Sequence, residues 1–188
     1  MRPILVIGDL IQDIYIQGQT LGMANEDPVL KFRPNQRSKI IRGGAGFIEN
    51  SVRSFCNAPV TLIPTSTSSI IRHIDERYDR NVFTLDMEPQ LHNITEALIL
   101  KALKANPAVV IVWDDQRAPK AMEAVLRALR NWNCPLDEES IVIVDSPHPR
   151  WNSSWIDYWK RSSEEERPYI LSKDTLFPVR ITTSATSV

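Results

Sequence analysis

The chain has 188 residues, of which 43% are apolar and 24% charged, and its formal net charge is −1. These values are ordinary for a soluble globular protein with a substantial core. A near-neutral chain lacks the positive charge that drives binding to nucleic acids or to membrane surfaces, so we expect neither partner. Two cysteines without metal-ligand spacing, and the absence of a long apolar segment, predict a cytoplasmic protein with free thiols.

In chain order, short apolar runs alternate with segments of helical periodicity. The runs predict buried strands at residues 3–11, 58–64, 108–115, 140–149 and 168–178, and the helical segments are 45–56, 93–107, 118–132 and 153–166. This alternation predicts an α/β fold, a Rossmann-like, mostly parallel sheet with helices on both faces. Segments within 13–42 and 68–88 alternate apolar and polar residues, which predicts a small antiparallel lid sheet. We expect residues 1–188 to form a single domain.

Acidic residues follow several of the predicted strands. Asp9 and Asp114 stand just past buried runs, where the carboxyl ends of parallel strands meet and ligands bind in open α/β sheets. Asp9 and Asp13 are therefore candidates to accept sugar hydroxyls, although Asp9 could equally cap a turn and Asp13 lie on the surface. Asp114, Asp115 and Asp145 could hold Mg²⁺ or a sugar, but such acids more often cap helices, so we expect no metal site.

All six glycines lie within the first 46 residues, three of them at Gly43, Gly44 and Gly46. Their spacing is not that of a dinucleotide-binding loop. They could cradle a ligand at the helix that follows, or they could let a lid strand cross the sheet edge closely. The sequence leaves both interpretations open.

Three tryptophans, Trp151, Trp155 and Trp159, recur four residues apart, from just before the last predicted helix into it. Such a stripe could stack on bases or sugars. At helical spacing it is more typical of a face that docks on the core or on a partner.

Three stretches, "VIGDLIQDIYIQGQ", "NEDPVLKF" and "RGGAGFIENSV", resemble in order and spacing the start of ribokinase-like (phosphofructokinase B type) carbohydrate kinases. The branch that they resemble most is the D-glycero-β-D-manno-heptose 7-phosphate kinases. The resemblance implies that Asp9, Asp13, Gly43 and Gly44 surround a sugar. It also implies a homodimer joined through the lid strands, because the family's lid sheet often pairs with that of a second subunit.

Later segments resemble the family less closely. In the family a substrate-contacting asparagine follows the paired glycines, where this chain has Phe47, with Asn50 nearby. The strand ending at Asp114 is similar to one that the family follows with Gly-Lys-Gly, and Arg117 stands at the lysine position. The resemblance thus adds Asn50, Asp114 and Arg117 as candidate substrate-binding residues.

The family's glycine-rich phosphate motif, with its catalytic aspartate, has no counterpart, since no glycine follows Gly46. We therefore expect no catalytic residues and no cofactor, with ATP and Mg²⁺ relevant only if a partner chain supplies the motif. Three hypotheses follow: a catalytically impaired relative that binds a sugar, sugar phosphate or nucleoside; a regulatory or structural dimerisation module; and a sugar kinase completed by a second chain.

Overall fold

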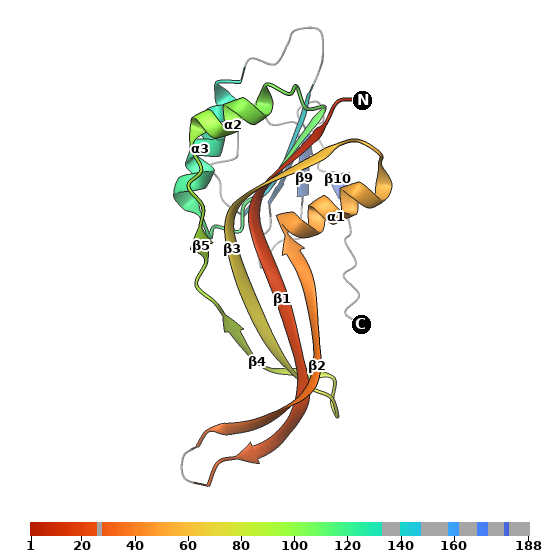
Figure 1. The fold of residues 1–188 in the computed structure, drawn as a ribbon, viewed down its shortest axis with the longest axis vertical. Helices are drawn as coiled ribbons and strands as arrows, with labels where there is room; N and C mark the ends of the chain where they lie inside the picture. Colours follow the sequence, from red (N-terminus) through yellow and green to blue (C-terminus); the bar gives the residue numbers. More distant parts are fainter. Residues whose placement is uncertain (26–27, 133–139, 148–157, 162–168, 173–178, 181–188) are drawn as a thin grey trace.

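A computed structural model describes residues 1–25, 28–132, 140–147, 158–161, 169–172 and 179–180. These residues form a ten-stranded sheet and three helices (Figure 1). In chain order the elements are β1 (Ile4–Met23), β2 (Leu30–Gly44), α1 (Ala45–Phe55), β3 (Val60–Asp75), β4 (Arg80–Asp86), β5 (Gln90–Leu91), α2 (Glu96–Leu103), β6 (Val109–Trp113), α3 (Pro119–Arg130), β7 (Ile141–Asp145), β8 (Tyr158–Arg161), β9 (Tyr169–Ser172) and β10 (Val179–Arg180).

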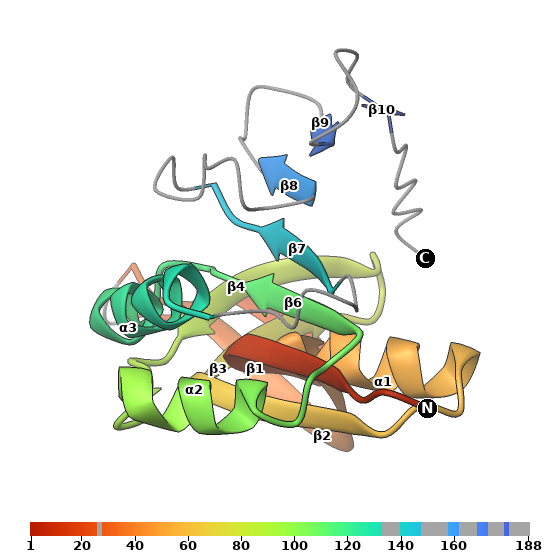
Figure 2. The ribbon, with the colours of Figure 1, turned by 90° about the horizontal axis from the view of Figure 1, so that it is seen from above.

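The centre of the sheet is parallel. Strand order is β10-β9-β8-β7-β6-β1-β3-β4, and the pairs β3–β1, β1–β6, β6–β7 and β7–β8 are all parallel. Helices α2 and α3 cover one face and α1 covers the other (Figure 2). The predicted mostly parallel sheet with helices on both faces is therefore confirmed.

Apolar side chains alternate between two cores because successive residues of a strand face opposite sides. Leu5 and Ile7 of β1 pack with α2 and α3 in the larger core, whereas Val6 packs beneath α1. Helix α3 buries one continuous stripe and begins at Pro119, as the sequence predicts. Helix α2 is capped by Thr95, whose hydroxyl accepts a hydrogen bond from the Leu98 N–H.

Strands β1 and β3 do not end at the core. They continue side by side beyond Asp9, so that the predicted core strands at 3–11 and 58–64 run on without a break into the lid segments predicted within 13–42 and 68–88. We call the projecting part the lid; it comprises β1 from Leu10, β2, β3 from Thr67, and β4. The lid's outer pairs, β1–β2 and β3–β4, are antiparallel, while its central pair stays parallel because both strands come from the parallel core.

One predicted helix is wrong where it is described. Residues 158–161, placed in a helix over 153–166, form strand β8 instead, and Tyr158 and Trp159 pair with Ile143 and Val144 of β7. Aromatic residues are favourable in a pleated strand as well as in the apolar face of a helix, and here pairing with β7 selects the strand. Trp151 and Trp155 lie outside the described residues.

The predicted strand at 168–178 is confirmed over Tyr169–Ser172, which form β9, and its other positions lie outside the described residues. Strand β10 had no signal in the sequence. A single domain over 1–188 stays a prediction because much of the C-terminal third lies outside the described residues. Among the described residues, no helix has the length and hydropathy needed to cross a membrane.

Candidate functional site

The candidate site lies where β1 exchanges one neighbour for another. Gly8 is the last residue of β1 paired with β6, and Leu10 is the first paired with β2. Asp9 sits between the two registers, opposite a register shift in β3 where two residues, Thr65 and Ser66, stand against one. This irregularity places the Asp9 side chain at the carboxyl edge of the parallel sheet.

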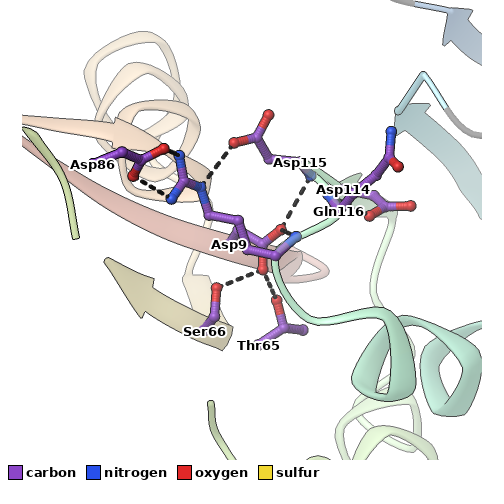
Figure 3. A network of polar contacts seen from close by, with 8 residues as sticks. Asp9, Thr65, Ser66, Asp86, Asp114, Asp115 and Gln116 are labelled. Carbon is purple, nitrogen blue, oxygen red and sulfur yellow. Dashed lines mark hydrogen bonds and ion pairs between the residues drawn. The ribbon is translucent and has the colours of Figure 1, made fainter. Parts of the chain in front are cut away.

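The Asp9 carboxylate is fully buried and accepts four hydrogen bonds (Figure 3). Oδ1 accepts from the hydroxyls of Thr65 at 2.8 Å and Ser66 at 2.7 Å. Oδ2 accepts from the backbone N–H groups of Asp115 at 3.1 Å and Arg117 at 3.3 Å. A sugar hydroxyl would have to displace one of these donors, so in this structure Asp9 joins β3 to the loop after β6 rather than facing a ligand.

Asp114 fulfils a similar structural role. It is 1% exposed; Oδ1 accepts from the Gln116 N–H at 3.0 Å and Oδ2 from the Ser146 hydroxyl at 2.9 Å. These bonds tie the loop after β6 to the residue that follows β7. As with Asp9, burial separates the carboxylate from any ligand at the surface of the site.

Arg117 joins the lid to the core. Its guanidinium donates from Nε to Asp115 Oδ2 at 3.0 Å, and from both terminal nitrogens to the Asp86 carboxylate at 2.8 and 3.1 Å. Asp86 ends β4 in the lid, while Asp115 follows β6 in the core (Figure 3). A bidentate Arg–carboxylate pair is geometrically specific, so this contact fixes where the lid rests.

The electrostatics of the two partners of Arg117 differ. Hydrogen bonding from Arg117 lowers the pKa of Asp86 below 3.8, against a smaller opposing effect of burial. Burial raises the pKa of Asp115 above 3.8, opposed by the bond from Arg117 and reinforced by the charges of Asp9 and Asp114. Burial and neighbouring carboxylates therefore disfavour the charged form of Asp115 in the core, whereas Arg117 favours the charged form of Asp86 in the lid.

Asp13 lies on the lid, one carboxylate oxygen engaged and one available. Oδ1 accepts from Arg72 Nε at 3.0 Å, and the side chain is 19% exposed. Oδ2 accepts no hydrogen bond from the described residues and lies 3.0 Å from the place that a Cβ on Gly43 would take. Of Asp9 and Asp13, only Asp13 keeps a carboxylate oxygen that accepts no hydrogen bond from the described residues.

Gly44 owes its identity to close packing. Its φ is +56°, and a Cβ at this position would stand 2.3 Å from the backbone oxygen of Asp9. The bare backbone thus lets β2 cross β1 at the start of α1. This is the close-crossing interpretation of the glycines, seen in the geometry of this chain; whether they also face a ligand stays a prediction.

The predicted site residue Asn50 lies on α1, as does Phe47, which stands at the family's asparagine position. Asn50 is exposed and forms no hydrogen bond with the described residues, so the structure gives it no partner in the site. Phe47 is 59% exposed, so the ring that stands where the resembling family has asparagine does not plug a closed cavity.

Sequence reasoning missed several residues of the site. Thr65 and Ser66 hold Asp9, Asp86 holds Arg117, and Arg72 holds Asp13. The run of hydroxyl residues in "PTSTSS" was a signal for the first pair, since it places several hydrogen-bond donors directly after a buried apolar run. Nothing in the sequence singles out Asp86 from the other acids of the lid. Among the described residues, no group of three or more His, Cys, Asp or Glu side chains is arranged to hold a metal ion.

No family model and no curated protein matches the chain. Solved structures do match. The ribokinase of Arabidopsis thaliana, in complex with ribose and ATP, is 9% identical with a TM-score of 0.52, covering 96% of this chain and 77% of that one. A protein named Sa239 is 10% identical with a TM-score of 0.60, covering 96% and 78%. The ribokinase of Thermotoga maritima is 16% identical with a TM-score of 0.46, covering 85% and 59%.

The fold is ribokinase-like. The predicted fold class is thereby confirmed, since the mostly parallel sheet with its helices matches the solved ribokinase of A. thaliana over 96% of this chain. At such low identities the likeness shows the fold alone. The ribokinase-like chain spans 59% of the length of the T. maritima ribokinase, and its kinship with the heptose 7-phosphate kinases stays a prediction.

Proposed function

We propose that this chain binds a sugar, a sugar phosphate or a nucleoside between its lid and its core, with Asp13 as the central acceptor. The available oxygen of Asp13 carries the proposal. A carboxylate oxygen that accepts nothing from the described residues is suited to a ligand hydroxyl, and charge-assisted hydrogen bonds are the strong ones.

A second polar group on the same face supports this assignment. Asp13 pairs with Ile70 of β3, so Ser68, two residues earlier, presents its side chain to the same face of the lid. Ser68 is 4% exposed, and its hydroxyl has no hydrogen-bond partner among the described residues. A buried hydroxyl without a partner is uncommon, and a ligand or an ordered water beside Asp13 would satisfy it.

The choice of ligand class rests on the fold. The ribokinase of A. thaliana has the same fold and was solved with ribose and ATP. The resemblance of the first quarter of the chain to heptose 7-phosphate kinases makes heptoses and their phosphates the next ligands to test.

We further propose that the chain by itself does not transfer phosphate. The backbone N–H groups of Asp115 and Arg117 at the carboxyl edge bond the Asp9 carboxylate, and are therefore not offered to a phosphoryl group. No glycine follows Gly46 to build another such cradle. Incubation with ATP and the sugars below should release no ADP above background, and any sugar-dependent release would overturn this part of the proposal.

Calorimetric titration with ribose, a heptose, their phosphates and adenosine tests the binding. At least one should bind, and Asp13→Asn should weaken it by about tenfold or more, because a charge-assisted hydrogen bond becomes a neutral one. Glu88→Gln is the matched control: it removes the same charge at an exposed position outside the site and should leave affinity unchanged. If Asp13→Asn and Glu88→Gln bind alike, the Asp13 assignment is wrong.

We also propose a homodimer joined through the lid. On the face opposite Asp13, a row of apolar side chains crosses all four strands: Ile40, Ile14, Ile71 and Leu85. Ile40 is 64% and Leu85 46% exposed, which leaves an uncovered apolar surface. The next row includes His73 stacked on Phe83 at 3.9 Å. A second lid would cover these side chains.

Sedimentation at micromolar concentration tests the dimer. Wild type should sediment as a dimer, and the double variant Ile40→Lys/Leu85→Lys as a monomer, since two charges cannot be buried in an apolar contact. Phe55→Lys is the control, because Phe55 is 89% exposed on α1, away from the lid. A monomeric wild type would refute the dimer and favour a different partner for this face.

A further inference from the structure

A cavity of about 610 Å³ lies in the lid and is lined by Tyr15, Gln17, Arg37, Ser38, Lys39, Ile41, Ile74 and Asp79. It is on the same face as Asp13. Ile41, one of its lining residues, lies directly opposite Asp13, and Lys39 lies opposite Tyr15. Since side chains two residues apart on a strand share a face, the cavity begins about 7 Å along β1 from Asp13.

The cavity carries an excess of positive charge, since two basic residues and one acidic residue line it. Strand β2, which forms one wall, contains five basic residues and no acidic one within Leu30–Gly44. Arg37 and Lys39 line the cavity, and their side chains form no ion pair or hydrogen bond with the described residues. Elsewhere on the lid face, by contrast, Arg72 is paired with Asp13. Two unpaired cations facing one hollow favour an anionic occupant.

Arg72 connects the cavity with the sugar acceptor. It lies opposite Tyr15 in β1, its Nε donates to Asp13 at 3.0 Å, and its guanidinium carbon stands 6.0 Å from the centre of the Tyr15 ring. One cation thus spans from the Asp13 carboxylate to the first residue of the cavity. A ligand whose hydroxyls reach Asp13 can therefore extend its other end toward Arg37 and Lys39.

We propose that this cavity binds the phosphate of a phosphorylated sugar or nucleoside, with Arg37 and Lys39 as its cationic groups and the Tyr15 hydroxyl as a further donor. This deepens the proposed function, on which it rests for the sugar end of the ligand. Asp79 is the only acidic residue among the lining residues and opposes the anion. The cavity therefore discriminates by charge: it prefers a phosphate ester to the corresponding neutral sugar or nucleoside.

Titrations with inorganic phosphate, ribose, ribose 5-phosphate, adenosine and AMP test the proposal. The double variant Arg37→Ala/Lys39→Ala should weaken binding of the phosphate-bearing probes by about tenfold or more, because charge-assisted bonds are lost. The control is Lys31→Ala/Arg33→Ala, which removes the same charge from the same strand outside the cavity. If both double variants weaken phosphate binding equally, the effect is the general charge of β2 and the proposal is wrong.

A gain of affinity provides an independent test. Asp79 has a φ of +47°, which asparagine also tolerates, so Asp79→Asn should fold normally and bind inorganic phosphate several-fold more tightly. Unchanged or weaker phosphate binding would contradict the proposal. The two sets of probes test the two proposals separately. The effect of Asp13→Asn on binding of ribose and adenosine tests the sugar site, whereas binding of inorganic phosphate tests the cavity alone. A preference for ribose 5-phosphate or for AMP identifies the class that carries the phosphate.

Discussion

Asp9 and Asp13 stand four residues apart on one strand, yet their surroundings differ completely. Asp9 is buried where β1 leaves the core, and all its hydrogen bonds come from the chain itself. Asp13 is on the lid, with one oxygen held by Arg72 and the other available. The difference shows that position at the carboxyl edge of a sheet does not by itself make an acid a ligand group. The number of donors that its own chain already provides determines whether a carboxylate oxygen is left for a ligand.

The largest expected effect comes from removing the Asp9 carboxylate. Asp9→Ala should lower the free energy of unfolding by about 3–5 kcal/mol, because it leaves two buried hydroxyls and two backbone N–H groups without their acceptor. Asp9→Asn should lose less, since its amide oxygen still accepts. Asp13→Ala should lose about 1 kcal/mol or less, as is typical of a partly exposed ion pair. Urea denaturation measures all three, and equal losses at the two positions would remove the distinction between them.

Gly44 tests the close packing around Asp9 through the backbone rather than through the carboxylate. Gly44→Ala should cost about 2–4 kcal/mol of stability, because alanine is strained at this φ and its Cβ overlaps the Asp9 carbonyl. Gly22→Ala is the control, since Gly22 has a φ of +92° but nothing within 4 Å of the added Cβ. Its loss should be about 1 kcal/mol, from backbone strain alone. Thermal unfolding distinguishes the two, and similar losses would mean that crowding at Asp9 is unimportant.

The contact between lid and core should depend on acid. Because the pKa of Asp86 is lowered in the folded chain, its pairing with Arg117 stabilises above pH 3.8 and is lost as the pH falls further, through the lowered pKa. Wild type should exceed Asp86→Asn in stability at neutral pH by under about 1 kcal/mol, since Asp86 is well exposed. The gap should close in acid. If the difference in stability between wild type and Asp86→Asn persists well below pH 3.8, the difference comes from packing rather than from charge.

Asp115 should behave in the opposite sense and produce the smallest effect. Burial raises its pKa, so its carboxylate opposes folding at neutral pH and ceases to do so as the pH falls through the raised value. Asp115→Asn should therefore match or slightly exceed wild type at pH 7, within about 0.5 kcal/mol, because the side chain is partly solvated. Denaturation curves at pH 7 and pH 4 check this, and a marked loss at pH 7 would show that the Arg117 bond outweighs burial.

The core of the fold was predictable because apolar runs and helical stripes carry it directly. The continuity of β1 and β3 was not, because Gly8-Asp9 and Pro64 read as breaks in isolation. In the structure both are absorbed by one register shift. The state of Asp9 was equally hidden: its hydroxyl donors lie 56 and 57 residues away and its backbone donors 106 and 108, so only the folded chain brings them together.

The uninterrupted passage of β1 and β3 from core to lid has a mechanical consequence. A flap joined to its core by loops can swing about them. Two strands that stay hydrogen-bonded from core to lid resist such a swing, so we expect the lid to move by bending where the strands leave the core. That place is the register shift at Asp9, where the carboxylate clamps both strands to the loop after β6. We therefore expect that a ligand or partner that displaces the tip of the lid will strain the hydrogen bonds of Asp9, and so affect the buried carboxyl edge of the sheet.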